Sequence, residues 1–311
     1  MRAVASYILK GPMQAMTSAL VPAVLSLSAP FMLKLVLIYF SGIVVGLVTL
    51  RMGPRQGFTV LLVAMLSTVL IAQFPGLNNT SGLDLWNTVY LWAMVWLGAS
   101  VLQATRSLAM MLEVTGLLAV LTIVAFFLVV NDPVQFSLQL LQPMREMLSH
   151  PDSGLSPTEV SGLISNAAKL LVGSVVAYTV FGVVISLFIA RSWQAKLYNP
   201  GGFQKEFMAL RFGKQVGLLA VIMIIALMFS GMLGELAGLI LINISIIMGL
   251  LFVIVGLGVS HGLVAELDNK GFWLVGIYAL LIMLSKVMAP LLMTLALSDI
   301  WVDYRSRFRK N

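Results

Sequence analysis

The sequence predicts an all-α, polytopic transmembrane helix bundle of eight or nine spans, and its composition and its long apolar runs lead to this fold class. Of the 311 residues, 60% are hydrophobic and only 10% are charged, with a mean hydropathy of +1.01. Soluble domains carry about 25% charged residues, so this chain has too few to cover a water-exposed surface. The same apolar excess excludes a disordered chain. We therefore expect a single integral membrane domain over residues 1–311, in contact with the lipid bilayer.

A membrane-spanning helix needs about 20 predominantly apolar residues to cross a hydrocarbon core about 30 Å thick. The first apolar segment is the least regular, because Pro12 and Pro22 interrupt it. Its basic start resembles a signal peptide, but the next apolar segment follows at once, so we expect an uncleaved helix. The predicted spans are 12–29, 31–50, 57–74, 85–104, 108–130, 170–190, 216–233, 236–259 and 271–298.

Lysine and arginine are distributed unevenly between the two sides of this topology. Eleven of them lie on the side of the N-terminus, against three (Lys34, Arg145 and Lys169) on the other. Because basic residues accumulate in cytoplasmic loops, we expect the N-terminus in the cytoplasm. The eleven are Arg2, Lys10, Arg51, Arg55, Arg106, Arg191, Lys196, Lys205, Arg211, Lys214 and Lys270.

The tail conflicts with this orientation, because nine spans place its four bases (Arg305, Arg307, Arg309 and Lys310) outside. Either the tail is an exception to the rule, or one late segment does not cross. We expect residues 299–311 to form a basic amphipathic tail, a short helix at a membrane surface with Asp299 as its N-cap. The alternative is a plain basic anchor after the last span.

Two connections are longer than turns. We expect 131–169 to be an outer amphipathic connection. Asp132-Pro133 starts an interfacial helix that Pro143 can kink. A capping box at Ser156 and Glu159 starts a second helix, which runs into the span ending near residue 190. The connection 191–214 is a basic, aromatic cytoplasmic loop with a turn at 199–202. It is either a lipid-bound loop or a docking surface for a protein partner.

Several segments in the second half of the chain resemble the YybS-like family of uncharacterised bacterial membrane proteins. The resemblance covers mainly residues 190–311, with weaker similarity at 49–57, and is carried by Leu197–Phe203, Glu206-Phe207, Leu210-Arg211, Ser260-His261-Gly262 and Ser298–Arg305. That family is distantly similar to the substrate-binding membrane components of energy-coupling-factor transporters. The resemblance implies a helical bundle in the bacterial inner membrane, and it assigns no activity to any residue.

Catalytic chemistry has little support in this sequence. Cysteine is absent, which excludes disulfides and thiolate metal sites, and no phosphate loop or His-Glu-x-x-His motif occurs. Gly258-Val259-Ser260-His261-Gly262 matches G-x-S-x-G, but it ends an apolar span instead of a strand. We expect no enzyme, no cofactor, no metal and no catalytic residue. Nucleic acid is not an expected partner, because no basic patch stands apart from the hydrophobic segments.

Lys286 is the first candidate for a binding residue. Within the predicted span 271–298 it lies about 18–21 Å from either end, too far for a lysine side chain to reach water. Pro290 cannot donate to the carbonyl of Lys286, which leaves a free carbonyl beside the ammonium. Loosened backbone and a buried charge are typical of transporter binding sites. We therefore expect Lys286 to face the bundle interior and to meet an acid such as Glu113 or an anionic solute.

Two further residues lie at membrane depth. Glu113 is five residues into its span, and Asn243 is a turn and a half into another, where it is more typical of a contact between helices than of a ligand site. Lys286, Pro290, Glu113 and Asn243 together favour a transporter-like component that binds a small solute and has no ATPase of its own. The alternative is a membrane scaffold that docks other proteins through its basic loop and tail.

Overall fold

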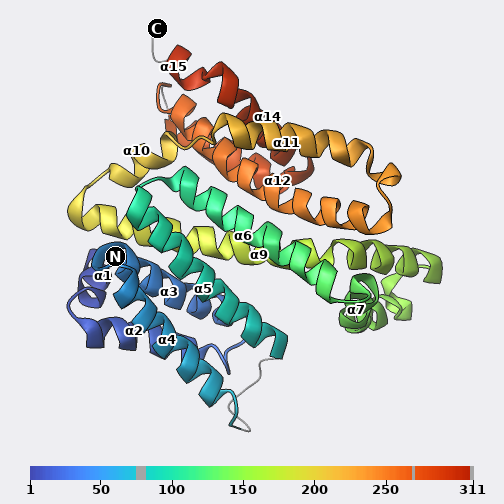
Figure 1. The fold of residues 1–311 in the computed structure, drawn as a ribbon, viewed down its shortest axis with the longest axis horizontal. Helices are drawn as coiled ribbons and strands as arrows, with labels where there is room; N and C mark the ends of the chain where they lie inside the picture. The colour runs from blue at the N-terminus through green and yellow to red at the C-terminus, as the bar shows by residue number, and fades with distance from the viewer. Residues whose placement is uncertain (75–81, 268–269, 309–311) are drawn as a thin grey trace.

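The computed structural model describes residues 1–74, 82–267 and 270–308, and within them it contains helices and no strands (Figure 1). Seven helices in this described part are long and apolar enough to cross a membrane. They are α3 (Phe31–Met52), α4 (Pro54–Ile71), α5 (Gly82–Thr105), α6 (Leu108–Val129), α9 (Pro157–Tyr198), α12 (Glu235–Val264) and α14 (Ser285–Val302). The chain is therefore an all-helical protein with the composition of a membrane bundle.

The predicted number of eight or nine spans is not confirmed, because three of the predicted spans form shorter helices. The segment 12–29 contains α2 (Pro12–Leu25), and 216–233 lies largely in α11 (Lys214–Met228). These helices have 14 and 15 residues, or about 21–22 Å of rise. Pro30 follows α2 and Gly231 follows α11, and both residue types interrupt helices.

Helix α3 lies at the centre of the first half of the bundle, against α2, α4, α5 and α9. Its glycines allow the close approach of α9: a Cβ at Gly42 would lie 3.2 Å from the Oγ of Ser186. On the α5 side, the fully buried indole of Trp92 donates to the Ile38 carbonyl at 3.0 Å. The interior here is filled by apolar side chains.

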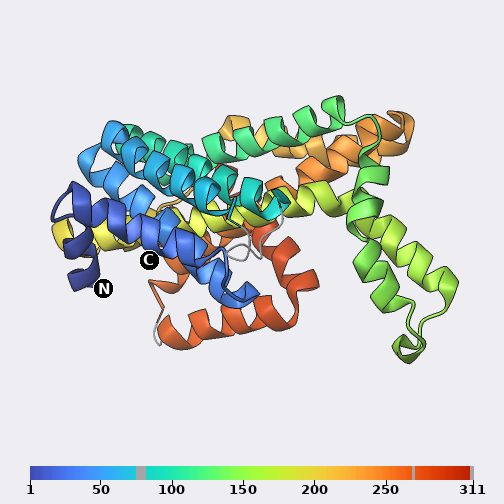
Figure 2. The ribbon, with the colours of Figure 1, turned by 90° about the horizontal axis from the view of Figure 1, so that it is seen from below.

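The outer connection forms a helical hairpin that projects from the bundle, as Figure 2 shows. Asp132 caps α7 (Pro133–Leu140) by accepting from the Gln135 amide at 2.8 Å, and the capping box of Ser156 and Glu159 starts α9, as predicted. The single interfacial helix predicted here is interrupted in the structure, since a new helix, α8 (Gln142–Leu148), begins next to Pro143. A small apolar cluster holds the hairpin together: Leu141, Val160, Ile164 and Ala168.

The basic connection 191–214 is more helical than predicted. Helix α9 extends to Tyr198, so the first eight residues of the predicted loop are its last two turns. The predicted turn follows, with Gly201 in the left-handed region at φ +82°, and it starts α10 (Gly202–Met208). Helix α10 packs closely on α12, because a Cβ at Gly258 would lie 2.7 Å from the Phe207 carbonyl.

The prediction of one span over 271–298 is wrong. Helix α13 (Lys270–Met283) ends before Leu284, whose backbone (φ −125°, ψ 43°) is not helical, and α14 starts at Ser285. The two helices contact each other, and Figure 2 shows that the chain turns back between them. They therefore form a hairpin whose tip carries Lys286. Ser285 and Lys286 follow the turn directly, but the run around them is otherwise apolar, so the mean hydropathy of the segment gives no sign of the turn.

The tail is anchored by charged side chains at the end of α14. Asp299 is not the N-cap that the sequence predicts, because α14 continues through it to Val302 and a new helix, α15 (Tyr304–Phe308), follows Asp303 in the left-handed region. Asp299 is fully buried and accepts from Arg211 Nε at 3.0 Å and from Arg305 Nη2 at 2.7 Å. Arg211 also donates to Asp303. We call Arg211, Asp299, Asp303 and Arg305 the tail latch.

The tail latch places α15 at the same end of the bundle as the 191–214 connection, because Arg305 also donates to the Met208 and Leu210 carbonyls. We call this the basic end. The hairpin α13–α14 leaves the basic end after α12 and returns to it, so Arg305 and Arg307 join the predicted inner bases. Of the two alternatives for the late topology, the structure supports the one in which a late segment does not cross as a single helix.

Candidate functional site

The four residues predicted to bind a solute do not come together. Asn243 is fully buried between α9 and α12, where its Oδ1 accepts from the Gly173 amide at 2.6 Å and its Nδ2 donates to the Lys169 carbonyl at 2.9 Å. These two groups are four residues apart on α9, so the amide bridges one turn of that helix. Asn243 therefore holds two helices together, as its position in the sequence indicated.

Lys286 does not face the bundle interior: its side chain is exposed at the tip of the α13–α14 hairpin. The expected contact with Glu113 is not formed, since Glu113 is half-buried on α6 and has no ion pair within the described residues. Pro290 lines an apolar pocket of about 260 Å³ between α11, α12 and α14, with Met248 and Met293. The solute-binding role of Lys286 and Glu113 stays a prediction that these positions do not support.

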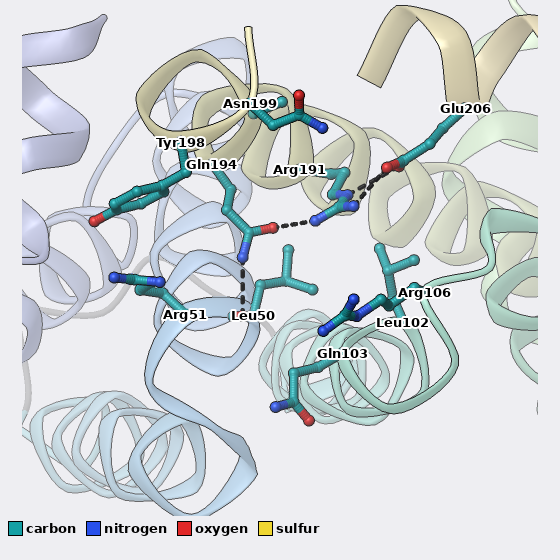
Figure 3. Close-up of a pocket in the computed structure, with 11 residues that line it drawn as sticks. Leu50, Arg51, Leu102, Gln103, Arg106, Arg191, Gln194, Tyr198, Asn199 and Glu206 are labelled. Carbon is teal, nitrogen blue, oxygen red and sulfur yellow. Dashed lines mark hydrogen bonds and ion pairs between the residues drawn. The ribbon is translucent and has the colours of Figure 1, made fainter. Parts of the chain in front are cut away.

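A larger and more polar pocket, of about 530 Å³, lies at the basic end between α3, α5, α9 and α10 (Figure 3). Three arginines from three different elements line it, against one glutamate, so its walls carry an excess of two positive charges. Its volume lies within the range of about 300–1,000 Å³ that is usual for small-molecule sites. The lining residues are Leu50, Arg51, Leu102, Gln103, Arg106, Arg191, Gln194, Ala195, Tyr198, Asn199 and Glu206.

Arg191 is the most constrained of the three arginines. Its Nε and Nη2 donate to the two carboxylate oxygens of Glu206 at 2.9 and 2.5 Å, and its Nη1 donates to the Gln194 Oε1 at 2.5 Å. Gln194 in turn donates from Nε2 to the Leu50 carbonyl at 2.9 Å, which ties α9 to the end of α3. Four-fifths of the Arg191 side chain is buried. This chain of hydrogen bonds forms one wall of the pocket (Figure 3).

Arg106 forms the opposite wall. It connects α5 to α6 with φ +55°, a conformation that is unusual for a residue with a side chain, and Ser107 then caps α6. Within the described part of the chain, its guanidinium has no hydrogen bond or ion pair with the protein. Strained backbone is often found at functional sites. An exposed, unpaired guanidinium beside a pocket is available to an anion.

Arg51 completes the basic lining from the end of α3. Its guanidinium lies over the ring of Tyr198, at 4.0 Å from the ring centroid, in a cation–π contact. This contact orients the arginine without neutralising it, since the ring carries no net charge. Arg51 and Arg106 therefore both reach the pocket without a carboxylate partner, while the one carboxylate of the lining, Glu206, is engaged by Arg191.

The chemistry available here is the binding of negative charge. Among the residues the structure describes, no group of three His, Cys, Asp or Glu side chains lies close enough to hold a metal ion. Ser260 of the G-x-S-x-G match donates its hydroxyl to the Gly256 carbonyl at 2.8 Å, one turn earlier on α12. That hydrogen bond is typical of a serine inside an apolar helix.

Sequence reasoning missed this pocket, although it counted all three arginines. Arg51, Arg106 and Arg191 each follow or end an apolar span, and in the sequence this position indicates only the orientation of the chain. The signal that could have found the pocket is their shared side of the membrane. The sequence alone does not show that α3, α5 and α9 lie side by side, and this arrangement is what makes the three arginines neighbours.

No protein-family model, no curated protein and no solved structure matches this chain. The resemblance to the YybS-like family therefore rests on the segments quoted above.

Proposed function

We propose that this protein binds a small anionic solute in the pocket at its basic end, as a transporter-like membrane component that has no ATPase of its own. The observation that carries the proposal is the set of three arginines around a polar pocket of about 530 Å³ with a single carboxylate. Guanidinium groups recognise carboxylates and phosphates through paired hydrogen bonds. This role is one of binding and not of catalysis.

The proposal includes a location and an orientation. The basic end faces the cytoplasm of a bacterial cell, because basic residues accumulate on that side and because the tail adds Arg305 and Arg307 to it. Helices α2 and α11 also cross the bilayer despite their length. Together with α3, α4, α5, α6, α9 and α12 they give eight crossing segments, and α13–α14 forms a re-entrant hairpin. Membership of the YybS-like family is part of the same proposal and is supported by the quoted segments.

Binding of acids by the purified protein tests the function. We would titrate inorganic phosphate, sulfate and succinate, with glucose as an uncharged comparison, and follow binding by calorimetry in detergent. Saturable binding of at least one acid, reduced about tenfold or more in Arg106→Gln, is the expected result, because loss of a charged hydrogen-bonding partner costs about 1.5–3 kcal/mol. Arg55→Gln is the matched control, since Arg55 lies at the same end and does not line the pocket. If no acid binds, or if both variants behave alike, the proposal is wrong.

A scaffold that docks a protein partner is the second candidate, and the tail latch favours it. The latch holds α15 against the residues that precede α11, so that tail and connection form one surface. Exposed bases on this surface include Lys205 and Arg307. Under this alternative, a partner co-purifies with the wild-type protein and is lost from Arg305→Gln, while acids do not bind the pocket.

A further inference from the structure

Glu206 occupies the position in the pocket that an anionic ligand would be expected to take. Its two carboxylate oxygens accept from the Nε and Nη2 of Arg191, and such paired contacts are also how arginine holds phosphate and carboxylate ligands. Its side chain is three-quarters buried, yet it belongs to the short helix α10 and not to a membrane-crossing helix. The pocket thus contains an anion supplied by the protein itself.

We propose that Glu206 is an internal competitor for the ligand of this pocket, and that a phosphate-bearing molecule displaces it from Arg191. The inference rests on the function proposed above. Once Glu206 leaves, Arg51, Arg106 and Arg191 all face the ligand, so three positive charges favour a phosphate dianion over a monocarboxylate. The volume of about 530 Å³ exceeds what an inorganic ion fills, so the ligand is an organic phosphate.

Displacement of Glu206 can move α10, because of how that helix is attached. The turn before it contains Pro200 and the left-handed Gly201, and the chain leaves it again after Met208. Phe203 and Phe207 of α10 pack on Phe188 of α9, with ring centroids 5.6 and 5.5 Å away. Release of Glu206 therefore removes the charged contact between α10 and α9 and leaves the aromatic one.

The aromatic contacts continue beyond α10 towards the α13–α14 hairpin. Phe207 lies against the ring of His261 on α12, at 5.3 Å between centroids, and the His261 Nε2 lies 3.0 Å from the hydroxyl of Tyr278 on α13. Side chains in direct contact therefore connect α10 with α12 and with α13 of the hairpin.

Calorimetric titration of the protein in phosphatidylcholine nanodiscs tests the displacement, with sn-glycerol 3-phosphate as the soluble probe and phosphatidic acid in the nanodisc as the lipid probe. Glu206→Gln should bind the probe about fivefold more tightly than the wild type, which corresponds to about 1 kcal/mol for a partly exposed ion pair. Glu266→Gln removes the same charge from an exposed position after α12 and should leave the affinity unchanged. Arg106→Gln should bind at least tenfold more weakly.

A label on α10 reports the movement. The chain has no cysteine, so Gln204→Cys introduces one exposed attachment site for an environment-sensitive fluorophore on this helix. The probe should change the fluorescence of the wild-type background, and Glu206→Gln without probe should already show part of that change. Thermal unfolding of each variant in detergent confirms that it is folded.

The outcomes separate the inference from the function on which it rests. If Arg106→Gln loses binding while Glu206→Gln binds as the wild type does, the displacement is wrong and the solute-binding function stands. Binding of phosphatidic acid alone, strengthened in Glu206→Gln, keeps the displacement, identifies a lipid headgroup as the ligand and contradicts a soluble solute. If the wild-type protein binds neither probe, the displacement by an organic phosphate is overturned.

Discussion

Substitution of Gly173 by alanine tests a close backbone contact between α9 and α12. Gly173 lies on α9 where Asn243 of α12 approaches it, and a Cβ at this position would lie 2.7 Å from the Asn243 Oδ1 and 2.8 Å from the Asn243 Cα and carbonyl oxygen. Real Cβ atoms essentially never come within 3.0 Å of a neighbour. Two of the three atoms are backbone, so a side-chain rotation of Asn243 cannot relieve the overlap, and α9 and α12 must separate.

The expected cost follows from the contacts that the separation breaks. Overpacking in a well-packed interior costs about 1–3 kcal/mol. Separation also lengthens the hydrogen bonds from the Gly173 amide and to the Lys169 carbonyl, which are worth about 0.6 kcal/mol each between membrane helices. Alanine gains about 0.8–1 kcal/mol over glycine in helix propensity. We expect Gly173→Ala to lose about 1–3 kcal/mol of unfolding free energy after this gain.

Gly162→Ala is a matched control on the same helix. A Cβ at Gly162 meets nothing within 4 Å. This variant should therefore show only the gain in helix propensity and unfold at a higher denaturant concentration than the wild type. The assay is reversible unfolding in mixed detergent–SDS micelles, followed by tryptophan fluorescence. Asn243→Ala should not rescue Gly173→Ala, because the backbone atoms of residue 243 remain. If Gly173→Ala is as stable as the wild type or more stable, the helix contact described here is refuted.

Three further predictions concern the ends of the bundle. A cysteine introduced at Ser306 should resist an impermeant thiol reagent in intact cells, while one at Ser149 should react; labelling at Ser306 would contradict the cytoplasmic position of the basic end. The Arg211 guanidinium lowers the pKa of Asp303 from 3.8 to about 2, so this carboxylate stabilises the folded state fully above pH 4, and the stabilisation is lost as the pH falls through 2. The difference in melting temperature between the wild type and Asp303→Asn should therefore stay constant from pH 7 to 4 and shrink below it; a difference that vanishes near pH 6 would count against this pairing. Lys286→Met should leave acid binding unchanged, because Lys286 lies at the exposed hairpin tip, and a loss of binding would restore the site predicted from the sequence.

Local signals in the sequence predicted local structure well. The caps at Asp132 and Ser156 form as expected, because their side chains satisfy amides within three residues and need no tertiary contact. The turn before α10 forms where Gly201 allows positive φ. Asn243 was predicted as a contact between helices because a buried amide inside an apolar span needs partners, and it has them.

The reversal at Leu284 shows where such signals end. Hydropathy measures whether a segment prefers lipid to water, and both helices of the α13–α14 hairpin prefer lipid, so a continuous apolar run cannot distinguish one long helix from two short ones. Lys286 was the only hint, because a charge in the middle of a span is costly, and it was interpreted as a binding residue. In the structure, the chain ends one helix and starts another just before the lysine, and the lysine side chain is exposed on the protein surface instead of facing the bundle interior.

Three arginines at the basic end are paired with carboxylates, and the other arginines of the pocket differ from them in this respect. Arg211 and Arg305 are paired with Asp299, and Arg191 is paired with Glu206. These pairs hold the tail and α10 in place, so their arginines have a structural role that requires no ligand. Arg51 and Arg106 line the pocket without such a partner, and an accumulation of basic residues on one side of a membrane does not by itself bring two of them to one pocket. An anionic ligand supplies the missing partner, and Glu206 is the group it would have to replace at Arg191.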